Sequence, residues 1–145
     1  MDFGKLHVLL VHFPIALGLA AALADLLWAI RKKDFFRQAG FYCLIMAAVA
    51  AIPTVITGDI NLEGRHFVGQ FHEIAETHEY LGIATLCVLL AAALLRAVRA
   101  NRPKGWWLRL YGLLVVAIVV LITLTGHWGG KISFGPEYLS GFFGT

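Results

Sequence analysis

The sequence predicts an all-α membrane protein whose four transmembrane helices form an up-down-up-down bundle. The 145 residues are 59% hydrophobic and 14% charged, which is more apolar surface than a water-soluble domain of this length can bury. Four apolar stretches each reach the length of about 20 residues that a membrane-spanning helix needs. The first and second stretches, and the third and fourth, are joined by short polar links, which favour antiparallel neighbours. We therefore expect residues 1–145 to form a single transmembrane domain.

The spans are expected at about residues 8–30, 36–58, 78–98 and 106–127. The first ends in Arg31-Lys32-Lys33, the flank of a spanning helix rather than of a cleaved signal peptide. The second contains Pro53, which should kink it. The polar link 59–77 should become helical from Gly69 to Tyr80, leading into the third span. Residues 128–145 are too short to span, and we expect them to form an interfacial tail or to lie against a partner.

The distribution of basic residues predicts the orientation. Lys and Arg gather in the first and third links: Arg31, Lys32, Lys33, Arg37, Arg96, Arg99, Arg102 and Lys104. The second link is acidic, so the positive-inside rule puts that link and both termini outside. We expect a multi-pass protein of the bacterial inner membrane with a periplasmic second link. Because the basic residues flank apolar runs, the net charge of +3 does not indicate a nucleic-acid partner.

Three residues within apolar runs are expected to have structural roles. Cys43 and Cys87 should lie at different depths, so we expect free thiols and no disulfide. Asp25 lies within about two turns of Arg31, which makes an ion pair or a helix-packing hydrogen bond its expected role.

All six histidines belong to the predicted outer side. His66 and His72 lie in the polar link and are expected to be ordinary loop residues. His12, His78 and His127 each stand at the edge of an apolar run, where a polar group needs a partner or a ligand. His7 is a fourth candidate, ranked last because it is close to the chain terminus.

Known metal motifs do not account for these histidines. The segment that begins His72-Glu73 has Glu76 where the HExxH motif of metalloproteases needs its second histidine. Imidazoles on antiparallel helices at a common depth suit haem b with two axial histidines. They suit equally a copper or zinc site of three or four imidazoles. Asp59 either orients a ligating imidazole from the second shell of the site or faces water.

Glycines follow the last histidine. Gly126, Gly129 and Gly130 would let a planar cofactor approach the backbone, or they end the helix.

Several short motifs resemble one family. They are His12-Phe13-Pro14-Ile15-Ala16-Leu17, Thr57-Gly58-Asp59, His78 with Gly82, and Gly126-His127-Trp128-Gly129-Gly130. They resemble a bacterial family of predicted membrane proteins of unknown function with HFPIAL-type and GHxGG signatures. The resemblance implies a four-helix membrane domain. It also implies redox work at the outer face, because related domains are sometimes joined to c-type cytochrome modules.

We therefore expect a b-type haem protein that transfers electrons at the outer face, with His12, His78, His127 and His7 as candidate ligands. It is more an electron-transfer protein than a stand-alone enzyme, and a c-type cytochrome or a quinone is the expected partner. One alternative is a copper or zinc binding or trafficking module that uses the same histidines. Another is a structural subunit of a larger membrane complex, or a homo-oligomer, docked through its aromatic tail.

Overall fold

The computed structural model describes residues 3–64, 69–99 and 104–137, and the side chains from residue 5 onward. These residues form α-helices and no strand: α1 (Phe3–Leu10), α2 (His12–Arg31), α3 (Asp34–Glu63), α4 (Gln70–Val98) and α5 (Trp106–Phe134). Because α1 and α2 together make one span, four stretches are long and apolar enough to cross a membrane. The predicted fold class is confirmed.

The helices are longer than the apolar runs from which we predicted them. α3 continues to Glu63, α4 begins at Gln70, and α5 passes through Gly129 and Gly130 to Phe134. The helical lead-in to the third span is confirmed, whereas the helix of the fourth span continues past His127, where we had expected it to end. A helix keeps its backbone hydrogen bonds where it leaves the apolar layer, so hydropathy marks the layer and not the helix ends.

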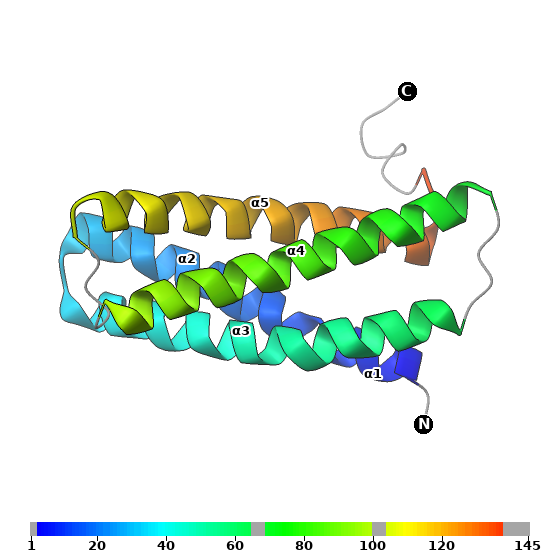
Figure 1. The fold of residues 1–145 in the computed structure, drawn as a ribbon, viewed down its shortest axis with the longest axis horizontal. Coiled ribbons are helices and arrows are strands. Elements are labelled where there is room, and N and C mark those ends of the chain that lie inside the picture. Colours follow the sequence, from blue (N-terminus) through cyan, green and yellow to red (C-terminus); the bar gives the residue numbers. More distant parts are fainter. Residues whose placement is uncertain (1–2, 65–68, 100–103, 138–145) are drawn as a thin grey trace.

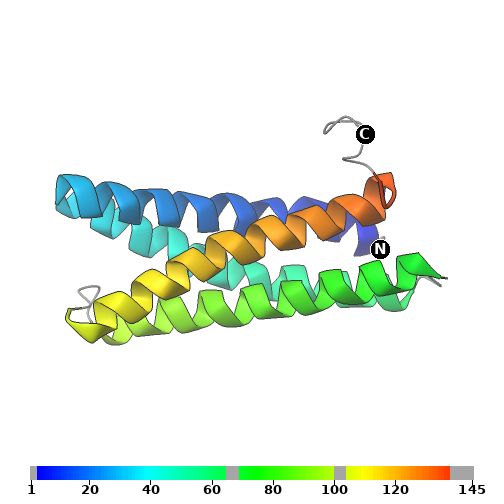
Figure 2. The ribbon, with the colours of Figure 1, turned by 90° about the horizontal axis from the view of Figure 1, so that it is seen from above.

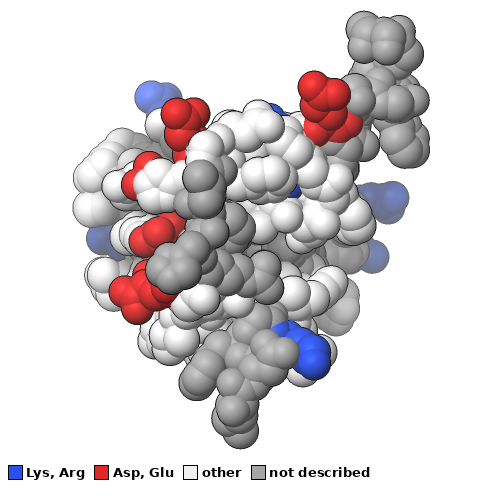
Figure 3. Space-filling view, turned by 90° about the vertical axis from the view of Figure 1, so that its right-hand side faces the viewer, with Lys and Arg blue, Asp and Glu red and all other residues white. Residues whose placement is uncertain are grey.

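Two helical hairpins pack face to face. The first consists of α1, α2 and α3, and the second of α4 and α5. The two short links lie at the same end of the bundle, which we call the basic end (Figure 1). α1, the start of α4 and the end of α5 lie at the opposite end (Figures 1 and 2). We call this the histidine end, and acidic side chains gather on it (Figure 3).

The second hairpin repeats the first at a separation of 71 residues. The pentapeptide Leu-Ala-Ala-Ala-Leu occurs at 19–23 and again at 90–94, and His7 corresponds to His78. α3 and α5 end on the corresponding glycines Gly64 and Gly135. Both hairpins run from the histidine end to the basic end and back. A pseudo-twofold axis along the bundle therefore relates them, as in membrane proteins built from parallel repeats.

The core between the hairpins is built from small side chains. Ala47 and Ala92 are fully buried, and so is Leu89. Such residues let helix backbones approach closely, which drives helix association where lipid is the solvent. Larger apolar side chains such as Leu94 and Val98 face outward, where lipid would solvate them. Cys43 and Cys87 are free, as predicted.

A buried ion pair joins the hairpins near the basic end. Arg96, 1% exposed, donates hydrogen bonds to the Asp25 carboxylate at 2.7 Å and to the Tyr111 hydroxyl at 2.8 Å. It also donates to the Arg37 carbonyl at 2.6 Å, and Tyr111 donates to Asp25. The ion pair and helix-packing hydrogen bond expected for Asp25 are therefore present, and the cation is Arg96 across the bundle rather than the nearby Arg31. Asp25 and Arg96 occupy corresponding positions of the two repeats, so the pair lies on the pseudo-twofold axis.

Candidate functional site

A cavity of about 350 Å³ lies at the histidine end, lined by residues of both hairpins. Its size falls within the range of about 300–1,000 Å³ that is common for small-ligand and cofactor sites. The deep walls are mainly apolar, with Ile15, Ala51, Leu86 and Ile122 among them. Asp59, Asn61, Glu79 and Ser133 supply its polar lining.

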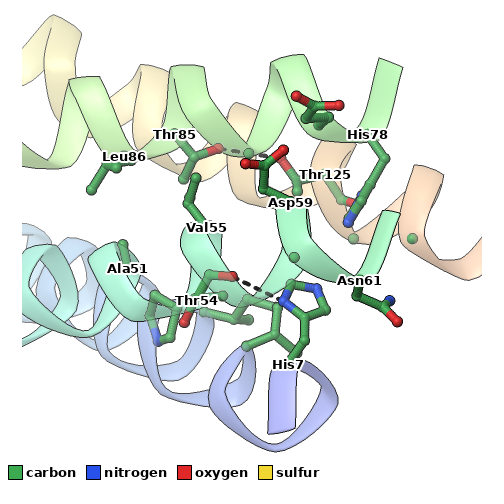
Figure 4. Close-up of a pocket in the computed structure, with 18 of the residues that line it drawn as sticks. His7, Ala51, Thr54, Val55, Asp59, Asn61, His78, Thr85, Leu86 and Thr125 are labelled. Atoms are coloured by element: carbon green, nitrogen blue, oxygen red, sulfur yellow. Dashed lines mark hydrogen bonds between the residues drawn. The ribbon is translucent and has the colours of Figure 1, made fainter. Parts of the chain in front are cut away.

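Two histidines face one another across this cavity (Figure 4). Nδ1 of His7 donates a hydrogen bond to the Thr54 carbonyl of α3 at 2.9 Å. Nδ1 of His78 donates to the Thr125 carbonyl of α5 at 3.0 Å. A carbonyl can only accept, so Nδ1 carries a hydrogen in both rings, and in the neutral form of each ring Nε2 keeps its lone pair. Both imidazoles are thus held in the tautomer that binds a metal through Nε2.

A glycine makes room for each imidazole one turn beyond the accepting threonine. A Cβ atom added to Gly58 would lie 2.9 Å from Cε1 of His7, and one added to Gly129 would lie 3.0 Å from Cε1 of His78. Real Cβ atoms rarely come so close to another carbon. Each hairpin therefore carries the same cradle. In each, the histidine lies on the first span of the hairpin, and the Thr-x3-Gly motif lies on the second span.

The two imidazole rings form an edge-to-face pair. The centroids of His7 and His78 are 6.4 Å apart, and the ring planes are nearly perpendicular at 85°. This separation lies within the range of about 4.5–7 Å that is usual for edge-to-face ring pairs.

The cavity follows the internal repeat. Its lining residues fall into pairs separated by 71 positions, for example Val11 with Gly82, and Ile15 with Leu86. Asp59 is the exception, because its counterpart Gly130 does not line the cavity. The pseudo-twofold axis therefore passes through the cavity, between the two histidines.

The other predicted site residues lie elsewhere. His12 is exposed, and its Nδ1 donates to the Val8 carbonyl one turn back at 2.7 Å. His127 is half-buried beside Trp128, with 6.3 Å between the ring centroids. Neither of these histidines lines the cavity.

The remaining two histidines were expected to be loop residues of the second link, but His72 is helical. His72 lies on the exposed first turn of α4 with Glu76 at 3.5 Å. His66 lies outside the described residues.

Asp59 lines the cavity, but it does not hold an imidazole of the facing pair. Backbone carbonyls accept the Nδ1 hydrogens of His7 and His78, which is the orienting role that we had considered for Asp59. Within the described ranges, no group of three or more His, Cys, Asp or Glu side chains is arranged to hold a metal ion.

The matched cradles were missed in the sequence. We had ranked His7 last and had assigned no role to Thr54, Thr125 or Gly58. The signal that could have found them is the repeat itself, because a histidine precedes Thr-x3-Gly by the same 47 residues in both halves.

The comparisons identify a family. The family described as "Predicted membrane protein (DUF2231)" matches residues 5–137. Because the match covers most of the chain, the chain belongs to this family, in agreement with the resemblance noted in its motifs. No curated protein and no solved structure matches the chain.

Proposed function

We propose that this member of the family is a b-type haem protein that transfers single electrons at its histidine end, with His7 and His78 as the axial ligands. The observation that carries the proposal is the facing pair of imidazoles, each fixed by a carbonyl so that Nε2 is free. Haem iron with two axial histidines needs two such nitrogens on opposite faces of a flat macrocycle.

The spacing of the rings supports two ligands in trans. With a metal–nitrogen bond of about 2.0 Å and a nitrogen roughly 1.1 Å from the ring centre, trans imidazoles place their centroids about 6.2 Å apart. Two ligands of a tetrahedral ion would bring the centroids to about 5 Å. The observed 6.4 Å agrees with the trans arrangement. This spacing argues against the zinc alternative, which also requires more ligands than this pair.

The symmetry of the cavity supports a macrocycle. A haem held by both histidines would lie between the hairpins, and the paired lining of the cavity would give its two halves similar surroundings.

When bound, the haem supplies one-electron chemistry, and the chain's own residues determine where the electron is exchanged. His7 and His78 bind and orient the group, Gly58 and Gly129 provide space for the imidazoles, and the apolar walls exclude water. The mouth opens at the histidine end, so a c-type cytochrome or a quinone on that side is the partner that we propose. We place the protein in the inner membrane with this end in the periplasm, because the opposite end carries the basic links.

A visible spectrum of the purified protein tests the proposal. We expect red protein whose reduced spectrum has the sharp bands of low-spin haem b. His7→Ala and His78→Ala should each abolish the low-spin spectrum, whereas His12→Ala and His127→Ala should preserve it. Colourless protein with stoichiometric copper would replace the haem proposal with a two-coordinate copper site. Colourless, metal-free protein that co-purifies with other subunits would support the structural alternative.

A further inference from the structure

We infer that the basic end carries a binding site for one anionic phospholipid, in a groove between the end of α2 and the start of α5. In this site Lys32 and Lys104 bind the lipid phosphate, and the acyl chains run along Ala29 and Leu108. The inference goes beyond the proposed function and does not depend on it, because the histidines lie at the opposite end of the bundle.

The groove lies between α2 and α5, which contact each other less than α3 and α4 do. A hollow of about 440 Å³ remains there, lined by the end of α2, the start of α3 and the start of α5. This volume falls within the range of about 300–1,000 Å³ that is usual for small-ligand sites. The contact between the hairpins therefore leaves room for a ligand at the basic end.

The charges that line the groove favour an anion. Its basic side chains are Lys32, Arg37 and Lys104, and its one carboxylate is that of Asp34. Nε of Arg37 donates to this carboxylate at 3.0 Å, and the Arg37 side chain is only 9% exposed. Lys32 and Lys104, by contrast, are exposed, and their flexible side chains can reach a ligand. Because Asp34 balances Arg37, the charge that attracts a ligand is that of the two lysines.

The first turn of α5 adds to this preference. The N-cap residue Gly105 makes no side-chain capping hydrogen bond, and the first turn has no acidic residue. The first N–H groups of a helix have no partner within it, and the helix dipole places a partial positive charge there. Gly105 itself lines the groove, so this partial charge lies beside the two lysines.

The apolar wall of the groove indicates a lipid rather than a soluble anion. Trp28, Ala29 and Leu108 line it, and Leu108 is 44% exposed. Trp106 and Trp107 begin α5, and tryptophan gathers at the level of the lipid headgroups. Basic pockets between transmembrane helices are known sites for anionic headgroups. A phospholipid matches both parts of the groove, with its phosphate at the lysines and its acyl chains on the apolar wall.

Binding of phosphatidylglycerol with a fluorescent acyl chain, followed by anisotropy on the detergent-solubilised protein, tests the inference. We expect the wild type to prefer it to phosphatidylcholine with the same chains. Lys32→Gln and Lys104→Gln keep a long polar side chain but remove the charge, so each should reduce this preference by about fivefold. Lys33→Gln is the matched control, because Lys33 is exposed and adjacent to Lys32 but does not line the groove. It should bind both lipids like the wild type.

Three results would overturn the site. The first is equal affinity of the wild type for the two lipids. The second is a loss in Lys33→Gln as large as that in Lys32→Gln and Lys104→Gln, since the attraction would then belong to the whole basic end. The third is displacement of phosphatidylglycerol by inorganic phosphate but not by chloride at the same ionic strength, which would indicate a site for small soluble anions.

The salt dependence of binding gives a measure that needs no variant, so a substitution that failed to fold would not affect it. The Debye length falls from about 10 Å at 0.1 M salt to about 3 Å at 1 M. The preference for phosphatidylglycerol should therefore decrease over this range, and an unaltered preference would contradict a site built on the two lysines. Haem content should be the same in all these variants. A failed lipid site thus leaves the haem proposal intact, and colourless protein leaves the lipid site intact.

Discussion

Substituting the cradle glycines should weaken the haem site without weakening the fold. A methyl group at Gly129 would lie 3.0 Å from Cε1 of His78, whereas ordinary contacts begin near 3.4 Å. The imidazole must therefore move by about 0.4 Å, which strains a hydrogen bond to Thr125 that is already 3.0 Å long. Losing that bond would cost about 1 kcal/mol, or about fivefold in haem affinity.

The same glycine substitutions should stabilise the helix, although they weaken haem binding. Replacing a helical glycine by alanine stabilises the helix by about 0.5–1 kcal/mol. Gly129→Ala should therefore leave the melting temperature of the haem-free protein unchanged or raise it, while haem binds more weakly and part of it becomes high-spin. Gly58→Ala should do the same through His7, with a methyl 2.9 Å from that ring.

Haem titration of the haem-free protein in detergent, followed by its visible spectrum, measures both effects. Gly112→Ala is the matched control, because Gly112 also lies in α5 and a Cβ atom there would meet nothing within 4 Å. It should bind haem like the wild type. Unaltered affinity and a fully low-spin spectrum in both Gly58→Ala and Gly129→Ala would refute the assignment of the facing histidines as ligands.

Three further predictions concern the bundle and its cofactor. Arg96→Met should destabilise the protein by about 3–5 kcal/mol because it leaves the buried Asp25 charge without its cation, whereas Asp25→Leu combined with Arg96→Met should recover most of that loss in thermal melts. Ligand planes at 85° should give oxidised protein a highly anisotropic low-spin electron paramagnetic resonance signal, and a rhombic signal typical of parallel planes would contradict the geometry. A reporter joined after Thr145 should be active outside the cytoplasm, and a cytoplasmic reporter would reverse the proposed orientation.

The sequence was a good guide to the membrane architecture. Apolar runs of spanning length predicted four spans because lipid imposes that length on any helix that crosses it. The exact ends were harder to predict. Helix continues through polar residues such as Glu63 and Gln70, and the break at Val11 is caused by Pro14, three residues further on.

The candidate site was only half predicted. We had considered each histidine only by its predicted depth in the membrane. That approach singled out His12 and His127, because both stand at the edges of apolar runs. Depth does not tell which side of a helix a residue faces, and the packing of the hairpins turns those two away from the cavity. His7 was ranked last because it is close to a terminus, but the Thr54 carbonyl and the space over Gly58 hold it in place.

Because the chain contains an internal repeat, residues matched between its two halves were a better signal of the site than any single residue. Positions on a pseudo-twofold axis meet their own counterparts, so a residue type kept in both halves meets itself, as His7 meets His78. A residue type changed in one half meets a different partner, as Asp25 meets Arg96. The two pairs lie on the same axis, 18 residues or about 27 Å apart along α4. The axis thus carries a pair suited to binding a cofactor at one end and a pair that locks the hairpins together at the other.

The two ends of the pseudo-twofold axis carry different residue pairs, and this limits the route that electrons can take. All the histidines of the chain belong to the histidine end or its link, so the half near the basic end has no imidazole for a second haem. There the axis is occupied by Arg96, Asp25 and Tyr111, which hydrogen-bond to one another. A single haem between His7 and His78 would therefore receive and return its electrons on the same side of the membrane. The proposed protein would thus be a one-sided electron carrier that meets its partner at the histidine end.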